Sequence, residues 1–166
     1  MTVAAVPAAL DSESSALFNP AFCSVLLQRA CTEYAAKAQQ ALPIVYAFLI
    51  LPSALHKPTR DALPGRTSAS MWPWLRDHPL LLMDLPDRAR SFRPYTAAAI
   101  IYGLTHTILN SGPGTIAAGT LSRRRANLQP TADWIACQKA AGFLGKWFAG
   151  TDADEPTTLA QWGVRP

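Results

Sequence analysis

Hydrophobic side chains recur at helical spacing along much of this 166-residue chain. The clearest case is Ser91–Gly119, where apolar residues continue to Leu109 before Asn110–Gly114 interrupts them with two glycines and a proline. The pattern predicts one long helix with Pro94 in its first turn, then a tight turn and a short strand over Thr115–Ala118. The helix is expected to be buried around most of its circumference through Ala98, Ile100, Ile101, Tyr102, Leu104, Thr105, Ile108 and Leu109.

A long helix followed by a turn and a strand is the order found in the second half of a winged helix, where the strand forms one side of the wing. The return strand of this wing is expected within Leu121–Pro130. With the helical patterns elsewhere, the prediction is a mainly α fold class: a compact multi-helix domain with a winged-helix-like helix and a short β-hairpin.

Further helices are predicted on both sides of this unit. Asn19 and Pro20 form a helix start, because Asn19 can cap the helix and Pro20 suits its first position. That helix is expected to reach about Gln40, and Thr131 is expected to cap another helix through Ala149. The small residues Ala141, Gly142 and Gly145 of that second helix are expected to let another helix approach closely. They lie near one stripe with Trp134, Ile135, Gln138 and Phe148. Shorter helical segments are expected over 42–51, on both sides of a corner at 57–58, from a Thr67–Ser68 cap to residue 77, over 80–90 and over 156–162.

The first seventeen residues differ from the rest, since they are rich in alanine and serine. We expect residues 1–17 to form a flexible N-terminal arm and residues 18–166 to form a single helical domain with one core. The start has no signal-like pattern, and the apolar run over 42–51 is about half of a bilayer span. We therefore expect no membrane segment. An odd number of cysteines without a signal peptide favours a reducing cytoplasm, and the three cysteines show no metal-ligand spacing.

Charge is distributed unevenly along the chain, whose formal net charge is +4. Residues 56–125 carry ten Lys or Arg against four Asp or Glu, an excess that suits nucleic acid or an acidic protein surface. Arg123, Arg124 and Arg125 are candidate contacts for phosphates or for a partner's carboxylates. Lys57 and Arg60 are further candidates, and a solvated charged loop is the competing interpretation for the arginine run.

Candidate catalytic groups are few in this sequence. His56 and Asp61 could meet across a corner and act as an acid/base pair. A capping and salt-bridging corner is the favoured interpretation, because no nucleophile or second histidine lies at a diagnostic spacing. We expect no enzyme, no cofactor and no metal site, since phosphate-loop, zinc and triad patterns do not occur.

The C-terminal tail is unusual because it places a large aromatic residue where a chain would normally fray. Trp162 is expected either to lock the domain or to be recognised by a neighbouring protein. Trp162, Val164 and Arg165 are therefore candidate partner-interface residues.

Several stretches resemble the middle component of three-component ABC systems, which are bacterial conflict operons that include Lamassu-type anti-phage defence. The resemblance runs from about Phe18 to Pro166, and it depends on the order and completeness of the stretches rather than on one motif. The matching segments are Asn19–Phe22, Leu51–Pro52 with Leu55–Arg60, Arg93–Thr96, Gly103–Leu104 with His106, Gly142–Phe148 and Gly163–Pro166.

This resemblance implies a small non-catalytic adaptor, with residues 18–166 as the middle-component domain. The implied partners are an SMC/Rad50-like ATPase and a toxic effector from the same operon, often a nuclease, with DNA as a further contact and no membrane. The adaptor would help to hold the effector inactive until foreign DNA is sensed. A stand-alone winged-helix DNA-binding regulator is the alternative, although the apolar long helix lacks the polar face of a recognition helix.

Overall fold

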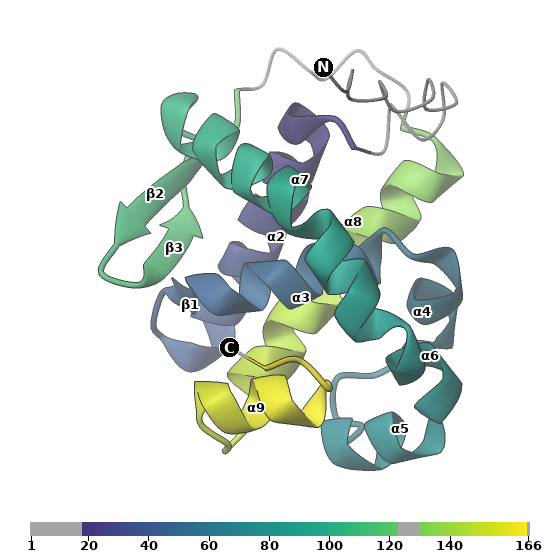
Figure 1. Cartoon of the computed structure of the whole chain (residues 1–166). Coiled ribbons are helices and arrows are strands. Elements are labelled where there is room, and N and C mark those ends of the chain that lie inside the picture. The colour runs from purple at the N-terminus through teal and green to yellow at the C-terminus, as the bar shows by residue number, and fades with distance from the viewer. Residues whose placement is uncertain (1–17, 123–129, 166) are drawn as a thin grey trace, which may run out of the picture.

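The computed structural model describes residues 18–122 and 130–165, and the structural statements below refer to that part of the chain. It confirms a mainly α fold with a small antiparallel sheet (Figure 1). The elements in chain order are α2 (Pro20–Ala38), β1 (Leu42–Pro43), α3 (Ile44–Ala54), α4 (Lys57–Ala62), α5 (Met71–Asp77), α6 (Pro79–Met83), α7 (Leu85–Thr105), β2 (Leu109–Gly112), β3 (Thr115–Ala118), α8 (Ala132–Ala149) and α9 (Glu155–Gln161).

Helices α2 and α3 form a middle layer that contacts α7 on one side and α8 on the other. In the view of Figure 1, α7 crosses the front of the molecule and α8 runs behind it. The hairpin of β2 and β3 projects at the left, while α5 and α9 lie at the lower end. One cluster of buried side chains from all these helices forms the core.

The start of α2 follows from its local sequence, as predicted. The Asn19 side chain accepts a hydrogen bond of 2.8 Å from the backbone N–H of Ala21, and Pro20 takes the first helical position. The helix ends at Ala38, where Gln39 adopts a left-handed φ of 56°. Thr131 caps α8 in the same way, since its side chain accepts from the N–H of Trp134 at 3.1 Å.

Small residues in α8 let it approach α2 closely, which confirms the prediction made from their pattern. A Cβ on Gly145 would lie 2.3 Å from the carbonyl oxygen of Ala30 in α2. A Cβ on Gly142 would lie 3.0 Å from Nε of Arg29. Ala141 and Phe148 of the predicted stripe are also buried, whereas Trp134 and Ile135 at the start of α8 are about 40% exposed.

The long helix differs from its prediction at both ends. α7 begins at Leu85 and ends at Thr105. The prediction of one helix over 80–90 and another from Ser91 to Leu109 is therefore wrong about where one helix ends and the next begins. Pro86 occupies the first turn, and Pro94 lies inside the helix rather than at its start. The helix stops early because the following residues pair in the sheet instead.

The buried face of α7 is also different from the expected one. Ile101 is 64% exposed, and Thr105 is exposed. Helical spacing could not select the inward side, because this stretch is apolar almost all round. Small residues determine which side of α7 is buried, since a Cβ on Gly103 would lie 2.6 Å from the Leu109 side chain. The buried residues are Leu85, Ala89, Thr96, Ala99, Ile100 and Gly103.

The hairpin lies earlier in the chain than predicted. Thr115–Ala118 is a strand, as expected, but its hairpin partner is Leu109–Gly112, not a segment of Leu121–Pro130. In that second segment the structure describes only residues 121–122 and 130, and none of them is in a strand. The sheet order β1-β3-β2 is completed by Leu42 opposite Ile116, so the hairpin attaches to the entry of α3.

Two local predictions in the shorter helices also need correction. The cap of α5 is Ser70, not Thr67 or Ser68, and the Ser70 side chain makes no capping hydrogen bond. Helix α3 runs from Ile44 to Ala54 with Pro52 inside it, so it begins and ends later than the segment expected over 42–51. The first error reflects three nearby Ser or Thr residues that are all chemically suited to capping.

Trp147 joins the helical core to the loop before α5. It is 3% exposed, and its indole Nε1 donates a hydrogen bond of 2.7 Å to the carbonyl oxygen of Ala69. We expect Trp147→Ala to lower the free energy of unfolding by about 3–5 kcal/mol, since it leaves a cavity and an unpaired carbonyl. Denaturant unfolding would measure this, with Trp72→Ala as the matched control because Trp72 is 56% exposed. Equal changes in both variants would contradict the packing described.

The close approach of α2 and α8 makes a second prediction. We expect Gly145→Ala to lower the free energy of unfolding by about 1–3 kcal/mol, although alanine is the better helix former. The added methyl group would meet the backbone of Ala30, which cannot move aside without separating the helices. Gly65→Ala is the control, because a Cβ there meets nothing within 4 Å. Thermal or denaturant unfolding that ranked Gly145→Ala as stabilising would contradict the contact.

Candidate interaction surfaces

His56 serves as the N-cap of α4, which is the capping role favoured from its sequence context. The backbone N–H of Thr59 donates to His56 Nδ1 at 3.4 Å, and the Thr59 hydroxyl lies 2.7 Å from the same nitrogen. Burial, with Arg88 nearby, lowers the pKa of His56, so its ring is neutral near pH 7. An Nδ1 that accepts the N–H of Thr59 leaves the ring proton on Nε2.

Lys57 and Arg60, both predicted contacts for phosphate or an acidic partner, lie in different environments. Lys57 is exposed and pairs with Asp61 at 2.7 Å, and its hydrogen bond lowers the pKa of that carboxyl group. The Arg60 side chain is only 8% exposed. It donates to the carbonyl oxygen of Ala54 at 3.1 Å and lies 3.5 Å from Asp133. Arg60 therefore ties α3, α4 and the start of α8 together, which corrects its predicted surface role.

The candidate residues of the C-terminal tail also lie in different environments. Trp162 is fully buried, and its Nε1 lies 3.3 Å from the sulfur of Met71. It offers no surface to a partner and locks the end of the chain onto the core, which corrects its candidate interface role. Val164 is half-buried against the core, and its N–H donates to the carbonyl oxygen of Leu159 at 2.9 Å. Arg165 is exposed.

The arginine run Arg123–Arg125 lies outside the described residues. Its predicted contact with phosphates or carboxylates stays a prediction.

Buried thiols provide no reactive group. Burial raises the pKa of Cys23 and of Cys31 to about 12 and also raises that of Cys137. A thiol with so high a pKa is protonated at neutral pH and is a poor nucleophile. Among the residues that the structure describes, no group of three or more His, Cys, Asp or Glu side chains could hold a metal ion. In the same residues, none of the helices combines the length and apolar character needed to cross a membrane.

Two short helices present large apolar side chains to solvent. Trp72 of α5 is 56% exposed, while Leu80 and Met83 of α6 are 74% and 69% exposed. We call these three residues the α5–α6 surface. Helix α6 contributes no fully buried residue, and it packs on the core through the half-buried side chains of Leu81 and Leu82. Sequence periodicity predicted a helix here but not its exposure, because Trp72 lies beside the buried Trp74 and Leu75.

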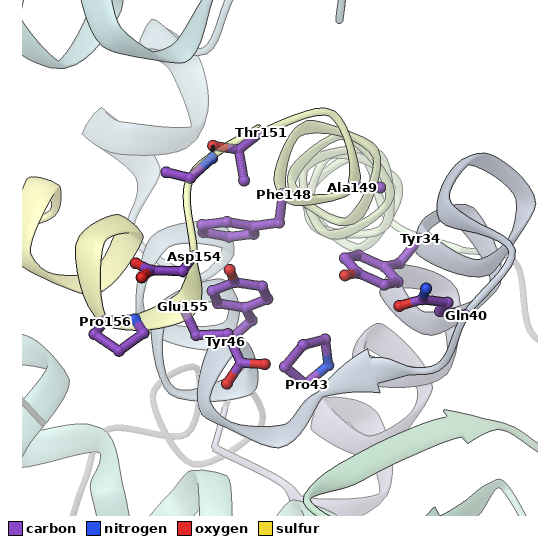
Figure 2. Close-up of a pocket in the computed structure, with 11 residues that line it drawn as sticks. Tyr34, Gln40, Pro43, Tyr46, Phe148, Ala149, Thr151, Asp154, Glu155 and Pro156 are labelled. Carbon is purple, nitrogen blue, oxygen red and sulfur yellow. Dashed lines mark hydrogen bonds between the residues drawn. The ribbon is translucent and has the colours of Figure 1, made fainter.

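An open pocket of about 430 Å³ lies between the end of α2, the start of α3, the end of α8 and the start of α9 (Figure 2). Tyr46 stacks on Phe148 with ring centroids 4.6 Å apart, and Tyr34 lies 6.5 Å from Tyr46. Asp154 and Glu155, at the start of α9, contribute the charged groups. We call this the Tyr34–Glu155 pocket; Gln40, Pro43, Ala149, Thr151, Ala153 and Pro156 complete its lining.

Sequence reasoning did not find this pocket. Its residues come from segments that are far apart in the chain, and each has an ordinary local role. The Asp154 side chain accepts a hydrogen bond of 2.8 Å from the N–H of Thr157, which caps α9 and lowers the pKa of Asp154. The Tyr46 hydroxyl lies beside Thr158, and burial raises the pKa of Tyr46. The aromatic residues at helical spacing were the one available signal, and they are equally typical of a core.

Comparison with known proteins gave one match. A family model described as ABC-three component (ABC-3C) system Middle Component 3 matches residues 8–166. Comparisons with curated proteins and with solved structures found no match. Because the family model covers nearly the whole chain, this protein belongs to the Middle Component 3 family of ABC-three component systems.

Proposed function

We propose that this protein is a non-catalytic adaptor of its ABC-three component system, which bridges an SMC/Rad50-like ATPase and a toxic effector. In this proposal it helps to hold the effector inactive until foreign DNA is sensed, as in Lamassu-type defence, and it acts in the cytoplasm. The family match over residues 8–166 is the observation that carries the proposal. A middle component of a multi-subunit system needs surfaces for other subunits rather than a reactive pocket.

The α5–α6 surface supports this role. Large apolar side chains exposed together mark protein-binding sites more often than isolated ones do. Tryptophan and methionine are enriched in protein interfaces, where they become buried in pockets of the partner. Among the predicted charged contacts, Lys57 and Arg165 remain exposed and are proposed to meet acidic groups of a partner. Val164 is proposed to extend that contact.

The proposal is tested by co-expressing the chain with the ATPase and effector encoded beside it and isolating the complex. We expect wild-type protein to be retained with its neighbours. Replacing Trp72, Leu80 and Met83 together by serine should weaken assembly by about tenfold or more, because exposed anchors lose their buried contacts. Size-exclusion chromatography and surface plasmon resonance would measure this.

The matched control is the pair Trp134→Ser and Ile135→Ser, which removes two large apolar side chains, each about 40% exposed, from the start of α8. Its assembly should match that of the wild type. A wild-type chain that stays unbound among its neighbours would contradict the adaptor role. A triple variant that assembles normally would show instead that the α5–α6 surface is not the interface.

A second candidate is a winged-helix DNA-binding regulator. With the short helices α4, α5 and α6 left aside, the order α2, β1, α3, α7, β2, β3 and the sheet order β1-β3-β2 favour it, since winged helices share this arrangement. The exposed side of α7 carries Arg90 and Arg93, but Ile101 is exposed as well. A recognition helix needs polar side chains for base contacts. We therefore rank this function second.

A gel-shift series in increasing salt, with specific and unrelated DNA, distinguishes the two functions. The adaptor proposal predicts no sequence preference by the isolated chain. A regulator would show sequence preference and a steep salt dependence, reduced by replacing Arg123, Arg124 and Arg125 with alanine.

A further inference from the structure

The Tyr34–Glu155 pocket is acidic although the protein as a whole is basic. Two carboxylates line it, and none of its lining residues is a lysine or an arginine. Glu155 takes part in no ion pair within 4.0 Å in the described part of the chain. Lys37 lies nearby, but its ammonium group packs over Gly150 at the end of α8 and does not line the pocket. The carboxylate charge of Glu155 is therefore not neutralised by the residues around it.

The Tyr34 hydroxyl is a second and independent group that the pocket offers to a ligand. Tyr34 is only 8% exposed, so more than nine-tenths of its surface is buried. Its hydroxyl has no hydrogen-bond partner within the described part of the chain, yet it is not one of the fully enclosed polar atoms that lack a partner, so it is open to the pocket. Figure 2 shows this hydroxyl directed into the pocket, toward Tyr46 and away from the Tyr34 backbone. A hydroxyl held by a buried ring and open to a pocket is placed to bond to whatever enters it.

The protonation states make the pocket rich in acceptors. Burial raises the pKa of Tyr34, and the charges of Tyr46 and Glu155 act in the same direction, so the phenol is neutral. Its oxygen keeps two lone pairs, and the ionised Glu155 can only accept hydrogen bonds. The Gln40 side chain adds an amide oxygen at the opposite rim (Figure 2). Such a set favours a ligand that carries several N–H donors and a positive charge.

Aromatic rings form the wall between these acceptors. Tyr46 and Phe148 are stacked with an interplanar angle of 12°, and both are only 2% exposed, so they form a rigid floor. A pocket of about 430 Å³ has room for one long side chain with its charged end.

We propose that the Tyr34–Glu155 pocket binds a basic side chain, lysine or arginine, presented by a partner subunit. Its charged group lies between the Glu155 carboxylate and the Tyr34 hydroxyl, and its aliphatic stem lies against Pro43. The identity of the partner as a subunit rests on the proposed adaptor function. The preference for a basic side chain rests only on the pocket.

The isolated full-length chain can therefore be tested without any partner. Nα-acetyl-arginine N-methylamide and Nα-acetyl-lysine N-methylamide would be titrated into labelled protein and followed by NMR. We expect saturable shifts of the backbone amides of Gln40, Thr151 and Glu155 with at least one of them. Nα-acetyl-citrulline N-methylamide, which has the shape of the arginine probe without its charge, should produce no saturable shift. Binding of the citrulline probe as tightly as the charged probes, or no saturation by either charged probe, would overturn the proposal.

Variants identify the atoms involved. We expect Glu155→Gln to weaken binding of the preferred probe by about tenfold, because it removes the charge but keeps the size of the side chain. Tyr34→Phe should weaken it severalfold through loss of one hydrogen bond. Asp152→Asn is the matched control, since Asp152 is an exposed carboxylate on the same loop outside the pocket lining, and should bind like the wild type.

An equal loss in the Asp152→Asn and Glu155→Gln variants would overturn the proposal, because it would indicate attraction by the loop as a whole. If a charged probe binds but the chain fails to assemble with its neighbours, the proposed ligand of the pocket stands and the adaptor function is contradicted. Normal assembly without binding of either charged probe would contradict the proposed pocket ligand and keep the adaptor function.

Discussion

The contact between α2 and α8 is the constraint on which the rest of this structure depends. Gly145 brings α8 against the backbone of Ala30, and no larger residue would allow that distance. Beside this contact, Glu33 accepts Arg29 of its own helix at 2.6 Å and Lys146 of α8 at 3.1 Å. The ion pairs flank an interface that small residues make possible. With α2 held this way, its opposite side is available to α7 and to the hairpin.

Two consecutive aromatic residues near the end of α8 pack against different parts of the molecule. Trp147 packs edge-on to Trp74, with centroids 5.4 Å apart, and thereby holds α5. Phe148 stacks on Tyr46 and lies 5.5 Å from Trp162, so it holds both α3 and the C-terminal tail. The aromatic residues that looked available for partners are thus largely used within the chain. The α5–α6 surface and the Tyr34–Glu155 pocket are the two sites that we propose for other molecules.

These two surfaces differ in how they would recognise a partner. The α5–α6 surface offers apolar area, which gives affinity with little directional preference. The Tyr34–Glu155 pocket offers a carboxylate without an ion pair in the described residues and a hydroxyl on a buried ring, which favour a donor in one position. A middle component with one surface of each kind could separate affinity from specificity. Both lie at the lower end of the molecule in the view of Figure 1, where α5, the end of α8 and α9 are found.

Features set by neighbouring residues were predictable from the sequence. The caps at Asn19 and Thr131 depend on one side chain and the next few N–H groups, and the structure confirms both. The capping role of His56 was predictable for the same reason, because it depends on the nearby N–H of Thr59. The small residues of α8 also predicted a close contact with another helix, because only residues without bulky side chains permit such a contact.

The order of helices and the family resemblance were therefore contained in the sequence itself. The tertiary structure alone decided which side of α7 faces inward, because an apolar helix packs where Gly103 and its neighbours leave room. It also decided that Arg60 and Trp162 are buried rather than offered to partners. The Tyr34–Glu155 pocket arises only when chain segments more than a hundred residues apart come together. Local sequence carries the first kind of information because it acts through the backbone, whereas burial depends on the whole packed chain.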